Sequence, residues 1–392
     1  MADLKIIKSA SKEDFDADVR RHRLDITLRV LVILAVVFAI AFAVKHYIDT
    51  RSYTGYEILK KTVRSDSDTA EYMVYNGHIL KYSQDGAESF DETDKANWNV
   101  TYEMQEPKIA TCGDYVAMSD LGSTEILVMN PDGNQTAIQT KLPVMNFNVA
   151  GQGVVAAVLE EGNTTRINVY DREGNQLAGI KSTMSKSGYP ADIALSPGGT
   201  LLGVTYIRME NDELKSSVAF YNFGDVGQNE IDNYVSGYDY EGTVIPRIKF
   251  LNNRTAVAIG DDKMVFYKGD QKPEALSANS IEDEIESVFY GPDEVGLVFR
   301  AESGANRYRI DLYSDSGKLK LSQEFEMAYT DIKLTSDRII IYNDSTCEIF
   351  DMKGKVKYDG LFEDSVILMA PTSNTTRFVL VNRNMTQMIQ LN

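Results

Sequence analysis

The sequence predicts an all-β fold: a β-propeller of seven or eight four-stranded blades, preceded by one transmembrane helix. Three observations support this prediction. A strand-and-turn signature recurs at intervals of 37 to 51 residues, the composition is that of a well-ordered β protein, and one uncharged apolar run lies near the N-terminus. Self-similarity at roughly forty to fifty residues, with several strands per unit, is typical of propellers. A β-sandwich or a β-solenoid is the alternative architecture.

The apolar run indicates a membrane span. Fifteen uncharged residues stretch from Val30 to Val44. As a helix they would rise about 22 Å, which is short of the roughly 30 Å hydrocarbon core. Apolar neighbours lengthen the run, and Arg29 and Lys45 can extend their charged ends to the two interfaces. We therefore expect residues 29–48 to cross a lipid bilayer.

Basic residues beside the run predict its orientation. Four arginines precede it and two basic residues follow it closely: Arg20, Arg21, Arg23 and Arg29, then Lys45 and Arg51. This excess places the N-terminus in the cytoplasm and the large domain outside the plasma membrane. A cleaved signal peptide is the alternative, although the 29 residues before the run are unlike a compact signal-peptide start. The predicted segments are a cytoplasmic tail (1–28), the transmembrane helix (29–48), a linker (49–55) and an extracellular propeller (56–392).

A strand that ends on an aromatic residue or methionine and runs into a glycine turn occurs seven times. The residues that close these strands are Tyr82, Met129, Tyr170, Tyr221, Tyr267, Tyr313 and Phe350. Glycine supplies the positive φ that short hairpin loops require. Four strands can be traced in the unit at 144–181, namely 145–150, 154–159, 166–170 and 176–180. Seven signals indicate seven blades.

The C-terminal residues 365–391 point to one more blade. They contain three further strands, VILMA, RFVLVN and TQMIQL, without a fourth. The strand Tyr56–Val63, at the other end of the predicted domain, could complete this blade and latch the ring. The sequence leaves seven and eight blades open and favours eight.

One unit carries a family resemblance. The segment Ala191–Ile207 reads ADIALSPGGTLLGVTYI and resembles the repeats of TolB-like, YVTN-type and other WD40-like propellers, in which a Ser-Pro-Asp-Gly turn joins two strands. Gly198 stands where those repeats usually have Asp. The Trp-Asp dipeptide of WD40 blades is absent, and the single Trp98 cannot supply the repeated motif of quinone-cofactor propellers. The layout looks like that of membrane-anchored propellers of Gram-positive bacteria, a resemblance of architecture that carries no functional residues.

Composition and motifs exclude several function classes. The net charge of −18 disfavours a nucleic-acid partner, because an acidic body repels phosphate. The sequence shows no nucleophile elbow, zinc-protease or phosphate-loop motif, and His78 has the features of an ordinary strand-edge histidine. Cys112 and Cys347 lie far apart in sequence and predict no disulfide. We therefore expect no cofactor, no metal and no enzymatic activity.

Loops offer the positive indication of function. In the propellers that this chain resembles, the connections between blades and those between second and third strands share one face. By that resemblance, 89–107, 160–165, 208–215, 222–246 and 302–306 would lie together. Two of these segments hold Trp and Tyr side chains among Asp and Glu, and these form the candidate binding face: Trp98, Tyr102, Tyr234, Tyr238 and Tyr240. The alternative is that these rings pack between blades.

Two functional hypotheses follow. The first is a membrane-anchored, extracytoplasmic, non-enzymatic module that binds or scaffolds an envelope protein or polymer. The second is a carbohydrate-active enzyme, a glycoside hydrolase or lyase, that uses paired carboxylates in the propeller channel. Two carboxyl groups that face each other at the channel mouth, with a raised pKa, would favour the second.

Overall fold

The computed structural model describes residues 12–64, 69–184, 187–210, 212–301 and 307–392. It divides into two compact units, Met1–Ser52 and Tyr53–Asn392. The first unit contains one helix and the second contains strands. Two short 3-10 helices, η1 (Gly227–Asn229) and η2 (Ile231–Asn233), interrupt the second unit.

Helix α1 (Lys12–Thr50) has 39 residues. Its segment Ile26–Ala43 has a mean hydropathy of 2.7, and its side chains are exposed. By length and composition this helix could cross a membrane, and a signal sequence meets the same description. Arg29 is exposed. The side chains of Arg20, Arg21, Arg23 and Lys45 lie outside the described part of the chain.

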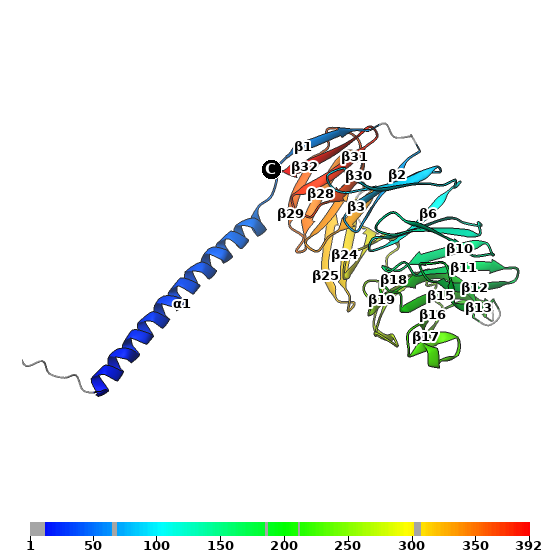
Figure 1. Ribbon diagram of the computed structural model, residues 1–392, viewed down its shortest axis with the longest axis horizontal. Helices are drawn as coiled ribbons and strands as arrows, with labels where there is room; N and C mark the ends of the chain where they lie inside the picture. The colour runs from blue at the N-terminus through cyan, green and yellow to red at the C-terminus, as the bar shows by residue number, and fades with distance from the viewer. Residues whose placement is uncertain (1–11, 65–68, 185–186, 211, 302–306) are drawn as a thin grey trace, which may run out of the picture. The chain divides into compact units, whose positions relative to one another are not determined.

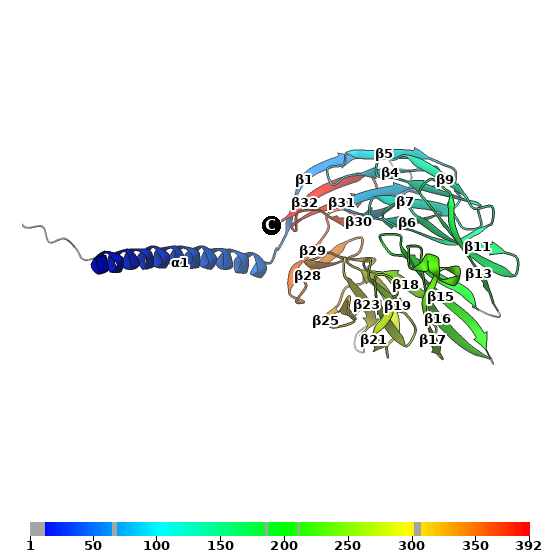
Figure 2. The ribbon, with the colours of Figure 1, turned by 60° about the horizontal axis from the view of Figure 1, so that its bottom comes forward.

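The second unit is a propeller of eight four-stranded antiparallel blades set around a common centre (Figures 1 and 2). Blade 1 is β2 (Glu71–Tyr75), β3 (His78–Tyr82), β4 (Gly86–Phe90) and β5 (Ala96–Thr101). Blade 2 is β6 (Pro107–Cys112), β7 (Tyr115–Asp120), β8 (Glu125–Met129) and β9 (Gln135–Gln139). Blade 3 is β10 (Val144–Val149), β11 (Val155–Glu161), β12 (Thr164–Tyr170) and β13 (Gln176–Thr183). Blade 4 is β14 (Tyr189–Leu195), β15 (Leu201–Glu210), β16 (Glu213–Asn222) and β17 (Tyr234–Glu241).

The remaining blades continue in the same order. Blade 5 is β18 (Arg247–Phe250), β19 (Thr255–Ile259), β20 (Lys263–Lys268) and β21 (Glu274–Ser280). Blade 6 is β22 (Ile285–Tyr290), β23 (Glu294–Arg300), β24 (Tyr308–Ser314) and β25 (Leu319–Phe325). Blade 7 is β26 (Asp331–Leu334), β27 (Arg338–Tyr342), β28 (Thr346–Asp351) and β29 (Val356–Leu361). Blade 8 is β30 (Val366–Pro371), β31 (Arg377–Asn382), β32 (Met385–Leu391) and, as its fourth strand, β1 (Tyr56–Val63).

The eighth blade confirms the predicted latch. Strand β1 pairs antiparallel with β32, from Tyr56 opposite Leu391 to Val63 opposite Met385. The fourth strand of blade 8 therefore comes from the other end of the domain. Blade 8 therefore has no turn between its third and fourth strands, and such a turn is present in blades 1 to 7.

One of the seven predicted signals was misplaced. Tyr82 ends β3, the second strand of blade 1, whereas the other six closing residues belong to third strands. The equivalent position in blade 1 is Phe90, the last residue of β4. The turn after Phe90 places Asp94, not glycine, at a positive φ of 67°. A search for glycine turns misses this copy because Asp also tolerates the left-handed region.

The turn between third and fourth strands has a common hydrogen-bonding pattern. In five blades its first residue accepts hydrogen bonds from the backbone N–H groups two and four residues later, at 2.8 to 3.4 Å. These residues are Asp91, Asn130, Asp171, Ser314 and Asp351. Short polar side chains at this position mimic a backbone turn. The hydrogen bond from the Asn175 side chain, with those from backbone amides, lowers the pKa of Asp171.

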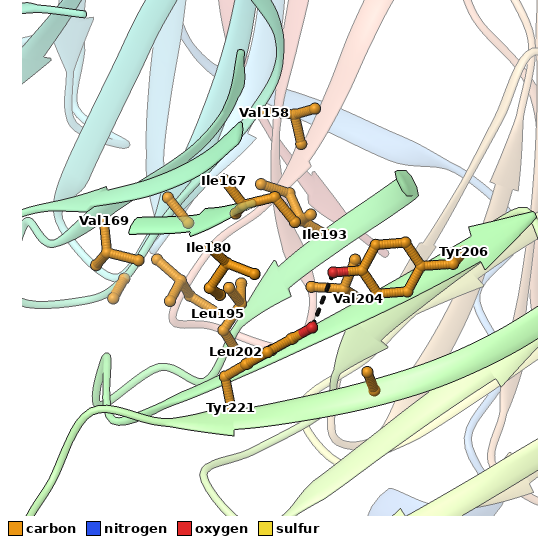
Figure 3. Close-up of a cluster of buried hydrophobic side chains, with 13 residues drawn as sticks. Val158, Ile167, Val169, Ile180, Ile193, Leu195, Leu202, Val204, Tyr206 and Tyr221 are labelled. Atoms are coloured by element: carbon orange, nitrogen blue, oxygen red, sulfur yellow. Dashed lines mark hydrogen bonds between the residues drawn. The ribbon is translucent and has the colours of Figure 1, made fainter. Parts of the chain in front are cut away.

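Eight clusters of buried apolar side chains join the blades into a closed ring, one at each blade-to-blade interface. Figure 3 shows the cluster between blades 3 and 4, where Ile167 and Ile180 meet Val204 and Tyr206. First strands of neighbouring blades also contact each other, so they line the centre. Burial on both faces of a blade explains strands such as β19, TAVAI, which is buried throughout.

Strand order defines two faces of the propeller. Connections between first and second strands, and between third and fourth strands, lie at one end of each blade, here called the turn face. Hairpins between second and third strands and the links to the next blade lie at the other end, the connector face. The expected grouping of five loops is therefore wrong in part, because 89–107 and 222–246 each contain a fourth strand and span both faces. Residues 302–306 lie outside the described chain.

Candidate binding grooves on blades 3 and 4

Two of the predicted aromatic residues pack between blades 1 and 2. Trp98 is 7% exposed and belongs to the apolar cluster of that interface, with Tyr102 against its edge. Gly133 of the neighbouring blade lies directly on the indole, since a Cβ there would fall 2.3 Å from the Trp98 Cβ. Burial raises the pKa of Tyr102 to about 12. These two rings are remote from the other three predicted residues, which all lie on β17 of blade 4.

The three tyrosines of β17 have different surroundings. Tyr238 and Tyr240 pack against the interface between blades 4 and 5. The Tyr238 hydroxyl donates to the Pro273 carbonyl at 3.2 Å, and the Tyr240 and Tyr267 hydroxyls lie 2.6 Å apart. Tyr234 is 46% exposed, with its ring edge-on to Tyr221 at 5.9 Å. Of the five predicted aromatic residues, Tyr234 presents the most exposed side chain.

Tyr234 lines a groove of about 540 Å³ formed by β15, β16 and β17 of blade 4 and by the segment that links blade 3 to blade 4. We call it the tyrosine groove; its walls include Met184, Tyr206, Arg208, Tyr221, Tyr234 and Asp239. Tyr206 and Tyr221 point toward each other at its base and their hydroxyls are 2.9 Å apart (Figure 3). Burial raises the pKa of both phenols, so they stay neutral donors and acceptors at physiological pH.

Ion pairs hold Arg208 in place in the wall of the tyrosine groove. Both terminal nitrogens of Arg208 donate to Asp239 Oδ1 at 3.2 Å, and Arg208 Nε lies 3.5 Å from a Glu210 oxygen. Lys215 contacts Glu210 at 3.4 Å and Glu241 at 3.1 Å. Because the Arg208 side chain is only 19% exposed while Asp239 is 70% exposed, the guanidinium is held in place and the carboxylate still faces water.

A second groove, of about 430 Å³, shares Met184 with the first. We call it the methionine groove; it is lined by Met145, Met184, Tyr189 and the hairpin residues 160–165 of blade 3. Five exposed apolar side chains gather at the connector-face ends of blades 3 and 4: Met145, Met184, Tyr189, Met209 and Leu214. Flexible methionine side chains are over-used at surfaces that bind other proteins.

The sequence search missed Arg208 and the methionines. The available signal was strand length, because β15 and β16 each have 10 residues where most strands have five to seven. Their extra residues carry Met209 and Leu214, which pair directly across the hairpin. An apolar pair at the exposed end of an overlong hairpin is a signal that the aromatic search did not use.

Comparison with known families gives a match over residues 49–391 to a family of unknown function, DUF5711. The chain belongs to the DUF5711 family. No curated protein matches the sequence. The family region coincides with the second structural unit and begins just before it.

Solved propellers share the fold of this DUF5711 member. BamB from Moraxella catarrhalis is 9% identical, with 86% of this chain and all of that chain covered and a TM-score of 0.50. Sqt1 from Chaetomium thermophilum is 12% identical over 87% and 97% of the two chains, with a TM-score of 0.52. A structure described as the eukaryotic initiation factor is 13% identical over 86% and 87%, with a TM-score of 0.52. At these identities the likeness concerns the fold.

The centre of the DUF5711 propeller has a carboxylate with a structural role. Asp192, on the first strand of blade 4, accepts the backbone N–H groups of Ile193 at 2.9 Å and Ile248 at 3.0 Å, and the Asn146 amide at 3.2 Å. It therefore ties together the first strands of blades 3, 4 and 5. Burial raises its pKa.

The other described carboxyl group with a raised pKa is Glu348. Burial, then the charges of Asp359 and Glu326, raise its pKa to about 7. Glu348 and Asp359 face each other across the third and fourth strands of blade 7. The hydrolase hypothesis expected an acid pair inside the channel, whereas this pair lies outside it. Neither Glu348 nor Asp359 lines either groove.

His78 also has ordinary surroundings. Its Nε2 lies 3.7 Å from an Asp114 oxygen and its Nδ1 3.2 Å from the Asn97 amide. The nearby Ser89 is fully buried and its hydroxyl accepts from Tyr75 at 2.6 Å, so it is not accessible to a substrate. Both cysteines are free, with Cys347 buried and Cys112 half-buried. No group of three potential metal ligands occurs among the described residues.

Proposed function

We propose that this protein is a membrane-anchored, extracytoplasmic scaffold that binds an envelope protein without catalysing a reaction. The observation that carries the proposal is the pair of adjoining grooves on blades 3 and 4, which share Met184 and bring together exposed methionine, tyrosine and ion-paired side chains. Such a mixture of adaptable apolar groups and rigid aromatic rings is typical of protein-binding surfaces.

The architecture supports the same proposal. Eight closed interfaces hold the blades, so loops and strand ends can vary without loss of the core. An apolar helix with basic residues ahead of it supports an anchor at the plasma membrane through residues 29–48, with residues 1–28 in the cytoplasm and 56–392 outside. The carboxylates with raised pKa occupy separate blades, which gives no support to a hydrolase centre.

Site-specific photo-cross-linking in cells tests the proposal. A benzophenone side chain at Met184 should give one discrete product that protease digests, because the partner is a protein. The matched control is Leu319, which is 47% exposed on the fourth strand of blade 6 and lines neither groove. Equal products from both positions would contradict a site on blades 3 and 4. A product that resists protease would identify a cell-wall polymer as the partner instead.

A further inference from the structure

We infer that the tyrosine groove recognises a positively charged segment of the partner, with a lysine or arginine side chain held against the Tyr234 ring between Asp232 and Asp239. This inference rests on the proposed function, since it names the chemistry of the partner that the same surface binds. It is carried by the charge of blade 4, by the exposure of one aromatic ring, and by the rigidity of the groove around it.

Blade 4 concentrates the negative charge of the chain. Residues 208–241 contain eight acidic and two basic residues, a net charge of −6 out of −18 for the whole protein. Both basic residues are engaged in ion pairs with acids of the same blade. Asp239 is 70% exposed even though it is paired with Arg208, and Asp232 is exposed as well, so charge complementarity favours a cationic segment beside Tyr234.

The two carboxylates beside Tyr234 approach it from opposite sides along the chain. Asp232, in η2, is exposed and precedes Tyr234 by two residues in the chain. Asp239, on β17, lines the tyrosine groove together with Tyr234, and its side chain is 70% exposed while its Oδ1 accepts from Arg208. An exposed aromatic face flanked by carboxylates binds ammonium and guanidinium groups through cation–π and charge attraction together.

The groove is preformed around Tyr234. Gly237 lies under the phenol, since a Cβ there would fall 2.1 Å from the Tyr234 hydroxyl. The ring also makes an edge-type contact with Tyr221, which is hydrogen-bonded to Tyr206. Because the ring is supported by both neighbours, a ligand does not have to order it, and less conformational entropy is lost on binding.

Fluorescence anisotropy with the full chain in a non-ionic detergent tests this inference. The probe is a short labelled peptide of alternating lysine and serine, which has no apolar side chains to partition into detergent. Its counterpart has glutamate in place of lysine. We expect the lysine peptide to bind, the glutamate peptide not to bind, and the affinity for the lysine peptide to fall as NaCl is raised.

Variants localise the binding. Tyr234→Ala should lower the affinity for the lysine peptide by roughly threefold to tenfold, whereas Tyr234→Phe should retain binding. Asp232→Asn should weaken it by about twofold to fivefold. Asn accepts the positive φ of 55° at this position, so the backbone is preserved.

The controls make each outcome decisive. Asp212→Asn removes the same charge from blade 4 at another residue of positive φ, 62°, on the β15–β16 hairpin. Leu319→Ala removes an equally exposed side chain from blade 6. The inference is wrong if Asp212→Asn lowers the affinity for the lysine peptide as much as Asp232→Asn does. It is also wrong if the glutamate peptide binds as well as the lysine peptide. A cross-link from Met184 in cells would still uphold the proposed function in that case.

Discussion

At the residue scale, the contact between Gly133 and Trp98 shows how the turns of one blade hold the core of the next. Gly133 and Gly77 have nearly the same backbone, with φ of 77° and 78°, but a Cβ on Gly77 would meet no atom within 4 Å. A comparison of alanine variants at these two glycines therefore separates the cost of backbone strain from the cost of a steric clash.

We expect Gly77→Ala to lower the free energy of unfolding by about 1 kcal/mol, the cost of a left-handed alanine. Gly133→Ala should lower it by about 1–3 kcal/mol more, because the indole has to move. Urea unfolding followed by tryptophan emission measures both, and since Trp98 is the only tryptophan its spectrum reports this contact. A red-shifted native spectrum is expected for Gly133→Ala alone; equal costs for both variants would contradict the packing argument.

A second residue-scale prediction concerns pH. Like charges directly opposite each other on neighbouring strands are destabilising, and the Glu348 carboxyl has a pKa of about 7 beside Asp359. Because its pKa is higher in the folded protein than in the unfolded chain, Glu348 favours folding most below about pH 4.5. That contribution is lost as the pH rises through about 7.

Glu348→Gln should therefore raise the melting temperature at pH 8 while it changes little at pH 5. The half-buried position limits the effect to the order of 1 kcal/mol. Thermal unfolding at both pH values measures it. Glu274 is an exposed acid on β21, and Glu274→Gln is the matched control. It should shift the melting temperature at pH 5 and at pH 8 by the same amount.

The sequence predicted which residue types the binding surface contains but not which of their side chains face solvent. Tyr234, Tyr238 and Tyr240 alternate along β17, and in a sheet with one solvent-facing side they would share a face. A propeller blade is covered on both faces by its neighbours, so alternation does not separate inside from outside. The bulge where β16 meets β17 changes the pairing at Tyr221 and Tyr234. Only the structure shows that Tyr234 faces water while the other two pack toward blade 5.

At the scale of elements, the segment that precedes β1 is tied into the ring. Tyr53 is 9% exposed in the cluster between blades 7 and 8, and its backbone N–H donates to the Lys357 carbonyl at 2.7 Å. Across the next interface, Lys60 of β1 donates to the Thr93 carbonyl at 2.6 Å, and Glu92 accepts the Ser373 N–H at 3.1 Å. The latch thus contacts blades 7 and 1 as well as its own blade.

Tyr53→Ala should lower the free energy of unfolding by about 2–4 kcal/mol, through the cavity left between two blades. Tyr189→Ala, at a side chain 41% exposed, should cost about 0.5 kcal/mol or less. Urea midpoints of the full chain in non-ionic detergent compare the two. A Tyr53 variant as stable as the Tyr189 variant would show that this segment adds nothing to the latch.

The latch was predictable from the sequence because the last blade had one strand too few. The three strands at residues 365–391 lacked a fourth, and Tyr56–Val63 was the strand proposed to complete their blade; both ends of β1 agree with that prediction. The turn of blade 1 was not found, because Asp94 takes the place of glycine. Long connections were also misjudged, since β5 and β17 carry polar residues on exposed edges and resemble loops.

At the scale of the whole molecule, orientation is the prediction on which the proposed function depends. Protease added to intact cells stripped of their wall should digest the propeller and spare a tag on the N-terminus, because the arginines ahead of the helix hold that end inside. Replacing Arg20, Arg21 and Arg23 by glutamine should weaken this orientation, since only Arg29 then remains. A protected propeller would reverse the topology. A mature protein that starts near Val44 would show a cleaved signal sequence.

The position of β1 also sets the order in which the protein can be completed. Tyr56 pairs with Leu391, so β1 must wait until all the other strands of the propeller have been made. At about 5–20 residues per second, this delay is on the order of tens of seconds. Throughout it, β1 is an unpaired edge strand, and the apolar flanks of blades 1 and 7 lack the neighbour that later covers them. Ring closure therefore has to wait for β32, and a chain that stalls before β30 would expose two apolar surfaces at once.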